Sequence, residues 1–174
     1  GSVARFAICD PRVVMTMSLA KALGVSGGAV LAAEEVIHSV RTAGAYVGST
    51  AMPLAVPSGI LAALRVMRAE PGRVRRAQGN QRRLFERLPE HPAIRGNPET
   101  PVTAVNPSSS VEAEAVREAL LDAGIYPTWI RYPGGAADGF FRFAVGSEHT
   151  ESEVDRLATA ITQGLGLDGD RAHR

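Results

Sequence analysis

The fold and the chemistry of this chain are indicated by Met17-Ser18-Leu19-Ala20-Lys21-Ala22-Leu23-Gly24, a run of small and apolar residues. It contains the only lysine, since the chain has 19 lysine and arginine residues and the other eighteen are arginine. Arginine stays protonated, whereas lysine carries a primary amine that burial can deprotonate and that can form a Schiff base. An apolar run is a costly place for an idle ammonium group. We therefore expect Lys21 to have a chemical role.

Outward from Lys21, two β-branched or Met-rich stretches, Arg12–Met17 and Gly28–Ala33, are typical of strands, with Lys21 in the connection between them. A short helix is expected over Glu34–Thr42, followed by a Gly-, Ser-, Thr- and Pro-rich loop from Ala43 to Pro57. A long helical region then runs from Ser58 to Arg68, breaks near Pro71-Gly72 and resumes to Leu88.

The last third of the chain alternates strands and helices. Ser109 with Glu112 can form a capping box for a helix over Val111–Ala123, and Gly124 is a suitable stop. Thr150 and Glu153 predict the start of a final helix in the same way. The remaining expectations are extended segments over residues 102–105, 125–132 and 140–145, a flexible loop over 133–139 and a frayed tail over 168–174.

Composition limits the possible functions. A chain of 174 residues with 45% hydrophobic content suffices for one compact domain or two small lobes. The net charge of +1 argues against a polyanionic partner, and no apolar stretch is long enough to span a bilayer, so a cytoplasmic protein without membrane contact is expected. Cys9 is the only cysteine and the four histidines show no ligand spacing, so we expect no metal site.

Three motifs in order carry a resemblance to a known family. Residues 18–24 with Gly27-Gly28 resemble the lysine motif of fold-type I pyridoxal 5'-phosphate (PLP) enzymes, and most of all the α-oxoamine synthases. This group includes 8-amino-7-oxononanoate synthase, glycine C-acetyltransferase, serine palmitoyltransferase and 5-aminolevulinate synthase. Residues 48–53 resemble the Ser-Thr-x-x-Pro segment before the family's long helix, and residues 141–150 resemble its late strand and Ala-His-Thr sequence.

The resemblance implies an α/β fold. Residues 1–70 would be the C-terminal portion of the large PLP-binding domain, and residues 71–174 a small C-terminal α/β domain that follows a long connecting helix.

The resemblance also implies site residues. Lys21 would form the Schiff base with PLP and move protons at the substrate's α-carbon, while the pyridine ring stores negative charge. Ser18, in place of the more usual threonine, would donate to the cofactor phosphate. Ser49 and Thr50 would reach the phosphate of the neighbouring subunit's cofactor, which makes the site shared across a dimer. A polar turn before Pro53 would explain the same two residues without that role.

Arg142 is the second candidate site residue. Alternation over residues 140–145 places its charge within an otherwise apolar strand, where an unpaired guanidinium is costly. The family match assigns its partner as the α-carboxylate of the amino-acid substrate, which suits a planar fork. The alternative is a structural ion pair, for example with Asp138.

The resemblance covers nearly the whole chain but only about the second half of a family member. The half without a counterpart would carry the residue stacked on the cofactor ring, the phosphate loop and the aspartate paired with the pyridine nitrogen. We therefore expect an N-terminal half as a partner, within a homodimer or heterodimer, and no activity of this chain alone. The expected substrates are an amino acid and an acyl thioester of coenzyme A or a carrier protein.

Other functions compete with this interpretation. An aminotransferase of the same fold type would use Lys21, Ser18 and Arg142 equally well, and an assembly subunit would need the fold but not the lysine. Residues 24–28 match the Gly-x-Ser-x-Gly string of a hydrolase elbow, but a strand rather than a helix is expected to follow Ser26. Eight arginines between Arg65 and Arg87 could bind nucleic acid. No aromatic side chains interleave with the arginines that share one helix face, so a solvated helix face is the favoured explanation.

Overall fold

The computed structural model describes residues 2–132 and 139–167. Contacts divide the chain into two compact units, Gly1–Glu70 and Pro71–Arg174. Within the described ranges, no helix is both long and apolar enough to cross a membrane.

Over residues 2–70, the first unit contains one β-hairpin and four helices. Strand β1 (Met15–Ser18) pairs antiparallel with β2 (Gly28–Leu31), with Ser18 opposite Gly28, so Lys21 lies in the connection, as expected. The helices are α1 (Ser2–Arg5), α2 (Glu34–Thr42), α3 (Gly44–Val47) and α4 (Ala55–Ala69).

Three expectations for this unit were wrong in extent. The second strand ends at Leu31 rather than at Ala33. The first strand begins only at Met15, because a turn precedes it in which Asp10 accepts hydrogen bonds from the backbone N–H of Arg12 and Val13. The expected loop from Ala43 to Pro57 contains α3 and the first turn of α4. Pro57 fits in that turn because the first N–H groups of a helix have no partner within the helix.

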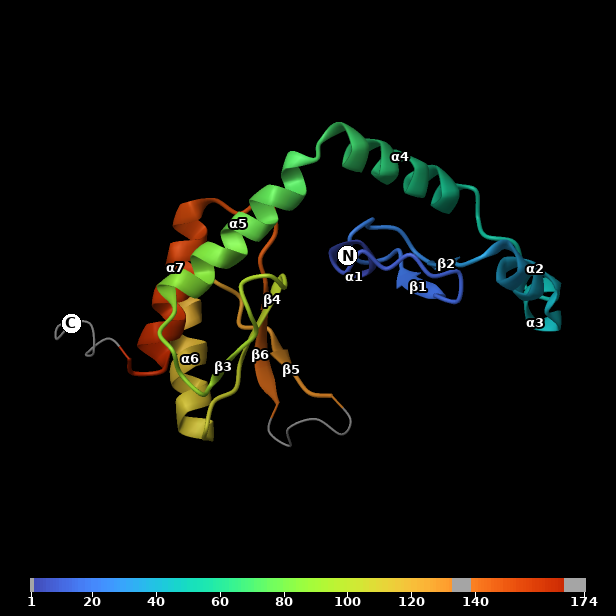
Figure 1. Cartoon of the computed structure of the whole chain (residues 1–174). Coiled ribbons are helices and arrows are strands. Elements are labelled where there is room, and N and C mark those ends of the chain that lie inside the picture. Colours follow the sequence, from blue (N-terminus) through green and yellow to red (C-terminus); the bar gives the residue numbers. More distant parts are fainter. Residues whose placement is uncertain (1, 133–138, 168–174) are drawn as a thin grey trace. The chain divides into compact units, whose positions relative to one another are not determined.

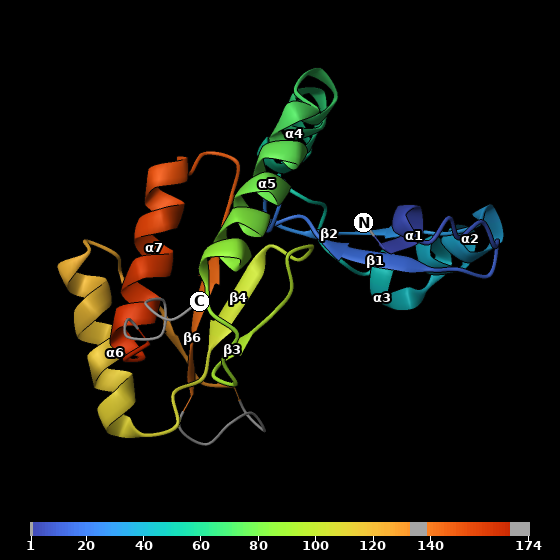
Figure 2. The same ribbon diagram turned by 60° about the vertical axis from the view of Figure 1, so that its left-hand side comes forward.

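The second unit is an antiparallel sheet with helices on one face (Figures 1 and 2). The strand order is β3-β4-β6-β5, and every neighbouring pair is antiparallel. The strands are β3 (Ile94–Arg95), β4 (Val102–Val105), β5 (Trp129–Ile130) and β6 (Phe140–Ala144); the helices are α5 (Gly72–Arg87), α6 (Ser110–Asp122) and α7 (Glu151–Gly164). Strand β3 was not expected, and the extended stretch before Tyr132 contains only two strand residues.

The core of this unit lies between the sheet and the three helices. Along β6, Phe141 and Phe143 are buried, whereas Arg142 and Ala144 are exposed, as the period of two requires. The ring of Trp129 meets that of Phe141 edge to face at 4.6 Å between centroids. The helices contribute the remaining large buried side chains, among them Leu84, Leu88, Val116, Leu120, Val154, Leu157 and Ile161.

Capping residues define where α6 and α7 begin. The box at α7 is complete: Glu153 N–H donates to Thr150 Oγ1 and Thr150 N–H donates to the Glu153 carboxylate at 2.7 Å. At α6, Ser109 accepts from Glu112 N–H at 3.2 Å, but the Glu112 carboxylate accepts from Ser108 instead of Ser109. The expected stop at Gly124 is confirmed by its φ of 69°.

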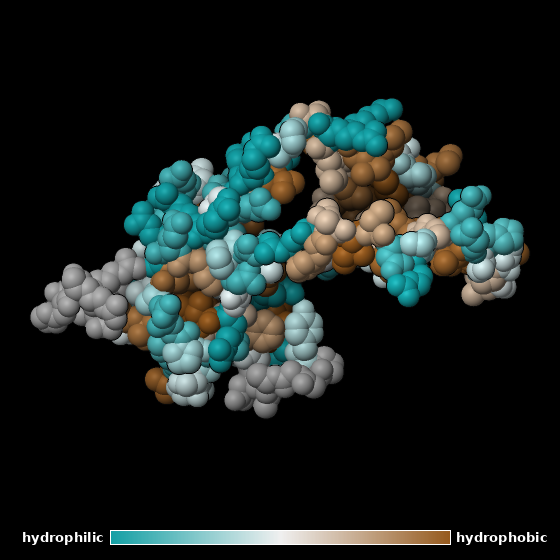
Figure 3. All heavy atoms as spheres, in the orientation of Figure 1, coloured by the Kyte–Doolittle hydropathy of each residue, from teal (hydrophilic) through white to brown (hydrophobic). Residues whose placement is uncertain are grey.

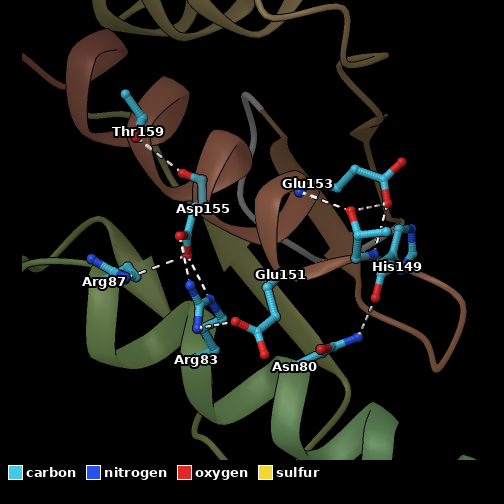
Figure 4. Close-up of polar contacts among 9 residues, drawn as sticks. Asn80, Arg83, Arg87, His149, Glu151, Glu153, Asp155 and Thr159 are labelled. Atoms are coloured by element: carbon cyan, nitrogen blue, oxygen red, sulfur yellow. Dashed lines mark hydrogen bonds and ion pairs between the residues drawn. The ribbon is translucent and has the colours of Figure 1, made fainter.

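The arginine-rich face of α5 is not simply solvated, contrary to expectation. Arg83 donates two hydrogen bonds to Asp155 of α7, at 2.7 and 2.8 Å, and also pairs with Glu151 at 2.7 Å (Figure 4). Arg87 reaches Asp155 as well, at 3.4 Å. Glu151 and Asp155, in the first two turns of α7, therefore attract this face, and the ion pairs hold the two helices together.

Candidate active site

The connection between β1 and β2, residues 19–27, forms a closed loop that we call the lysine loop. Leu19 N–H donates to Gly27 O at 2.9 Å, and Val25 N–H donates to Leu19 O at 3.1 Å. The Leu19 side chain is only 5% exposed, whereas Lys21 is exposed. The loop is thus anchored by Leu19 and presents Lys21 outward.

The apolar residues around Lys21 in the sequence suggested an apolar interior, but the structure does not place Lys21 in one. The small residues around it turn the chain and leave the side chain accessible within this unit. Ser18, at the end of β1, is also exposed, and its hydroxyl has no hydrogen-bond partner in the described part of the chain. An amine and a free hydroxyl three residues apart are therefore both available to a ligand. After Ser26 the chain enters strand β2, which does not fit a hydrolase elbow.

Two side-chain contacts hold the lysine loop against other parts of the first unit. Val25 lies so close to helix α4 that a Cβ at Gly59 would be 2.6 Å from its Cγ1. Met52 approaches the other side of the loop, with its Cε 3.1 Å from the position of a Cβ at Gly27, where φ is 108°. The lysine loop is thus positioned by α4 and by the segment that precedes it.

The segment before α4 also contains Ser49 and Thr50, and both are exposed. Ser49 Oγ donates to Tyr46 O at 2.7 Å, closing a turn at the end of α3. Thr50 lies beyond this turn, and its hydroxyl has no partner among the residues described. The Met52 contact joins this segment to the lysine loop, but Ser49 itself has a local structural role.

Arg142 lies in the second unit, on the sheet face opposite the helices, and it is exposed. This corrects the expectation of a guanidinium enclosed by apolar neighbours. Its Nη1 donates to the hydroxyl of Tyr132 at 2.8 Å. Within residues 2–132 and 139–167 no carboxylate pairs with it, and Asp138 lies outside the described residues. Arg142 therefore has donors left for an anion.

The chain after β6 is held by α5. Asn80 Nδ2 donates to His149 O at 2.8 Å (Figure 4). It also donates to Gly146 O at 3.0 Å, and Gly146 N–H donates to His149 Nδ1 at 2.9 Å. His149 and Thr150, which match the family's late motif, thus shape the turn from β6 into α7. The carboxylate of Glu153 receives two hydrogen bonds from Thr150, which lower the pKa of Glu153, the backbone N–H contributing most.

A cavity of about 200 Å³ lies beside β6 and the start of α7. Its polar lining residues are Thr128, Arg142, His149 and Glu153, and apolar residues such as Ile125 complete it. Arg142 is thus next to a space of the size of a small metabolite.

The donors of the first unit fit part of a PLP site. The amine of Lys21 suits the aldehyde of PLP, and the unpaired hydroxyl of Ser18 suits its phosphate. In the part of the chain that the structure describes, no three His, Cys, Asp or Glu side chains are grouped as metal ligands.

Sequence reasoning missed three residues of these regions. Tyr132 is the partner of Arg142, but the register that brings them together depends on where β5 ends. Asn80 and Gly59 contact segments 66 and 34 positions away in the sequence, respectively. The only local signals for these two contacts were that Gly59 is a glycine and Asn80 a short polar residue within predicted helices.

Comparison with known proteins agrees with these features. Residues 3–161 match the family described as Aminotransferase class I and II. The chain is 31% identical over 165 residues to 8-amino-7-oxononanoate synthase from Symbiobacterium thermophilum, covering 94% of this chain and 42% of that protein. It is 35% identical over 163 residues to the synthase from Mycolicibacterium smegmatis, covering 89% and 40%.

A solved structure shows the fold. Serine palmitoyltransferase from Sphingomonas wittichii matches 87% of this chain and 39% of its own chain, with 20% identity and a TM-score of 0.72. The chain thus spans about two fifths of the length of its curated relatives. The resemblance to the α-oxoamine synthases and the expected α/β transferase fold are confirmed. On the match over residues 3–161, the chain belongs to the Aminotransferase class I and II family.

Proposed function

We propose that this chain supplies the lysine and the carboxylate-binding arginine of a PLP-dependent α-oxoamine synthase. Such an enzyme condenses an amino acid with an acyl thioester and releases carbon dioxide. The observation that carries the proposal is the lysine loop, which presents the only lysine of the chain outward, three residues after a serine whose hydroxyl has no partner among the described residues. Residues 1–70 would be the end of the large domain and residues 71–174 the small domain.

PLP, which serine palmitoyltransferase structures of this fold contain, supplies an electron sink for negative charge at the amino-acid α-carbon. Lys21 Nζ would bond covalently to the cofactor and later hold or move the α-proton. The Ser18 hydroxyl would donate to the phosphate. Ser49 and Thr50 would donate to the phosphate of the second subunit's cofactor, a role in which Thr50 has the freer hydroxyl.

Arg142 would bind the carboxylate of the amino-acid substrate. A guanidinium offers five N–H donors in a plane, and only one of its nitrogens is used by Tyr132. Two parallel N–H groups can therefore meet the two oxygens of a carboxylate.

The exposed hydrophobic side chains of the first unit support the proposal that a further polypeptide packs against it. In the described part of the first unit Leu19 is the one buried hydrophobic side chain, while Phe6, Val47 and Leu54 are 67%, 70% and 84% exposed. On α4, hydrophobic side chains such as Leu61, Leu64 and Met67 are exposed, and Figure 3 shows hydrophobic surface in this region. Soluble proteins rarely expose apolar area on this scale without a partner for it. We infer that a complementing part covers this unit and that the chain alone is inactive.

The test is covalent labelling of Lys21. The chain is incubated with PLP, with and without the part of the S. thermophilum synthase that lies outside the matched region, then reduced with borohydride and mapped by peptide mass spectrometry. Because Lys21 is the only lysine of this chain, its N-terminal amine is the one other primary amine of the chain to separate, and Lys21→Arg is the matched control. A pyridoxyl adduct on Lys21 that requires the complementing part is expected. Its absence in a folded complex would contradict the proposal and favour an assembly subunit.

The family description favours an aminotransferase as the second candidate. Lys21, Ser18 and Arg142 serve either reaction, so labelling does not separate the two. The completed enzyme is therefore assayed for thioester-dependent carbon dioxide release and for amino transfer to a 2-oxoacid. Release of carbon dioxide with the thioester is the expected result, and amino transfer without it would favour the aminotransferase.

A further inference from the structure

On one face of the sheet of the second unit no helix of the described residues packs, and we call this the open face (Figure 2). Arg142 lies on this face of β6, and the register places Ala104 of β4 opposite it. A methyl group is too short to cover a guanidinium, so the small neighbour leaves Arg142 accessible.

Tyr132 is held beside Arg142 by two contacts. Its hydroxyl accepts a hydrogen bond from Arg142 Nη1 at 2.8 Å. Its ring packs against that of Phe140, with centroids 6.1 Å apart and planes inclined by 43°. Phe140 is two residues before Arg142 on the same strand, so one strand face positions both the ring and the charge.

The hydroxyl of Tyr132 has a proton left to donate. A phenol can accept one hydrogen bond and donate another, and here the accepting role is taken by Arg142. Among the described residues no acceptor receives the Tyr132 proton. An anion bound by the remaining N–H groups of Arg142 can therefore accept a further hydrogen bond from the phenol.

We propose that Tyr132 and Arg142 form one carboxylate subsite, in which the Tyr132 hydroxyl is the donor that complements the guanidinium. This rests on the proposed function, because it deepens the role given to Arg142. A carboxylate has two acceptor oxygens and about four lone-pair sites, which match two guanidinium N–H groups and one phenol. A neutral amide carries N–H groups where a carboxylate has its second oxygen, so the pair selects the charged acid.

The first experiment uses the completed, PLP-loaded enzyme. Dissociation constants of glycine and of glycinamide are measured from the cofactor absorbance for wild type, Tyr132→Phe and Arg142→Gln. Tyr126→Phe is the matched control, because Tyr126 is 82% exposed and its side chain makes no hydrogen bond or ring contact among the described residues. Tyr132→Phe keeps the ring on Phe140, and circular dichroism checks that each variant is folded.

We expect Tyr132→Phe to weaken glycine binding roughly tenfold or more, the usual effect of losing one hydrogen bond to a charged group. Glycinamide binding stays unchanged, and Tyr126→Phe behaves as wild type. Arg142→Gln weakens glycine binding more than Tyr132→Phe does, because it removes the charge as well as the donors.

A second experiment needs no cofactor. The ¹⁵N-labelled chain is titrated with sodium acetate at constant ionic strength, with sodium chloride as the reference, and the Arg142 side-chain signals are followed by NMR. We expect a saturable shift of these signals with acetate. The acetate concentration at the midpoint should be higher for Tyr132→Phe than for wild type.

The outcomes separate this inference from the proposed function. Equal glycine binding by wild type and Tyr132→Phe, with weaker binding by Arg142→Gln, would overturn the role of Tyr132 and leave that of Arg142. Equal binding by all variants, with Lys21 still labelled, would overturn both carboxylate roles. Weakening of glycine and glycinamide alike by Tyr132→Phe would also overturn the inference, because it would indicate a structural role.

Discussion

Gly59 of α4 and Val25 of the lysine loop are in direct contact, and a Cβ at Gly59 would lie 2.6 Å from Val25 Cγ1. No real Cβ contact is that short, so the loop reaches this position only because residue 59 has no side chain. Val25 N–H also donates to the carbonyl oxygen of Leu19, the buried residue that anchors the loop, so the contact with Gly59 is linked to this anchor. Helix α4 therefore helps to set the position from which Lys21 is presented.

Gly59→Ala is expected to loosen the lysine loop. The added methyl must displace Val25, and overpacking of this kind costs about 1–3 kcal/mol. Hydrogen exchange measured by mass spectrometry on peptides covering residues 19–27 should become about tenfold faster or more. Gly79→Ala in α5 is the matched control, because a Cβ there meets nothing within 4 Å. Equal exchange in the two variants would contradict a positioning role for Gly59.

Helices α6 and α7 approach each other closely where Gly164 faces Val116. A Cβ at Gly164 would overlap the backbone and side chain of Val116, which is fully buried. Backbone cannot rotate away as a flexible side chain can, so Gly164→Ala must separate the helices. We expect a loss of about 2–3 kcal/mol in the free energy of unfolding, measured by urea denaturation. Gly79→Ala should instead be neutral or stabilising by up to about 1 kcal/mol; a Gly164→Ala variant as stable as wild type would contradict this packing.

Local signals allowed much of the fold to be predicted. The helix over Glu34–Thr42, the capping box at Thr150 and the alternation along β6 follow from interactions within a few residues, and the structure has all three. Strand β3 could not be predicted in this way. Its two residues, Ile94 and Arg95, are in a strand because they pair with β4, which is a non-local contact.

The same limit applies to the candidate site. The sequence singles out Lys21 by its uniqueness and Arg142 by its apolar neighbours, but not the exposure of either side chain. Exposure depends on which face of the sheet the helices cover and on how the lysine loop closes around Leu19. The Tyr132 partner of Arg142 likewise depends on the pairing of β5 with β6.

The caps of α6 and α7 offer a graded test of capping. Thr150→Ala removes the hydroxyl of a complete capping box, and Ser109→Ala removes the hydroxyl of a partial one. A lost N-cap costs about 1 kcal/mol on average. Because Thr150 Oγ1 also donates to Glu153 at 2.9 Å, we expect Thr150→Ala to lower the urea midpoint more than Ser109→Ala. A larger fall of the urea midpoint in Ser109→Ala than in Thr150→Ala would contradict the idea that the reciprocal hydrogen bonds at α7 add stability.

The Arg83 and Asp155 pair predicts how stability depends on pH. Hydrogen bonds from Arg83 are the main cause that lowers the pKa of Asp155, and the charges of Arg83 and Arg87 add to it. A carboxyl group with a lowered native pKa stabilises the fold fully above its unfolded value of about 3.9 and loses this effect as pH falls through the native value. Asp155→Asn should therefore lower the urea midpoint by a constant amount between about pH 7 and pH 5, and the difference should shrink below about pH 4.

Two features make the comparison specific to Asp155. Glu153 also has a lowered pKa, so the wild type and the variant both lose stability in acid, and only their difference reports Asp155. Glu114→Gln is the control, since Glu114 forms an exposed ion pair with Arg117 at 3.3 Å on one helix and such pairs contribute little. We expect a small change in its midpoint. An Asp155→Asn difference that persisted unchanged at the lowest pH would show that the loss comes from altered packing rather than from the charge, because a protonated aspartic acid and the asparagine that replaces it are both neutral.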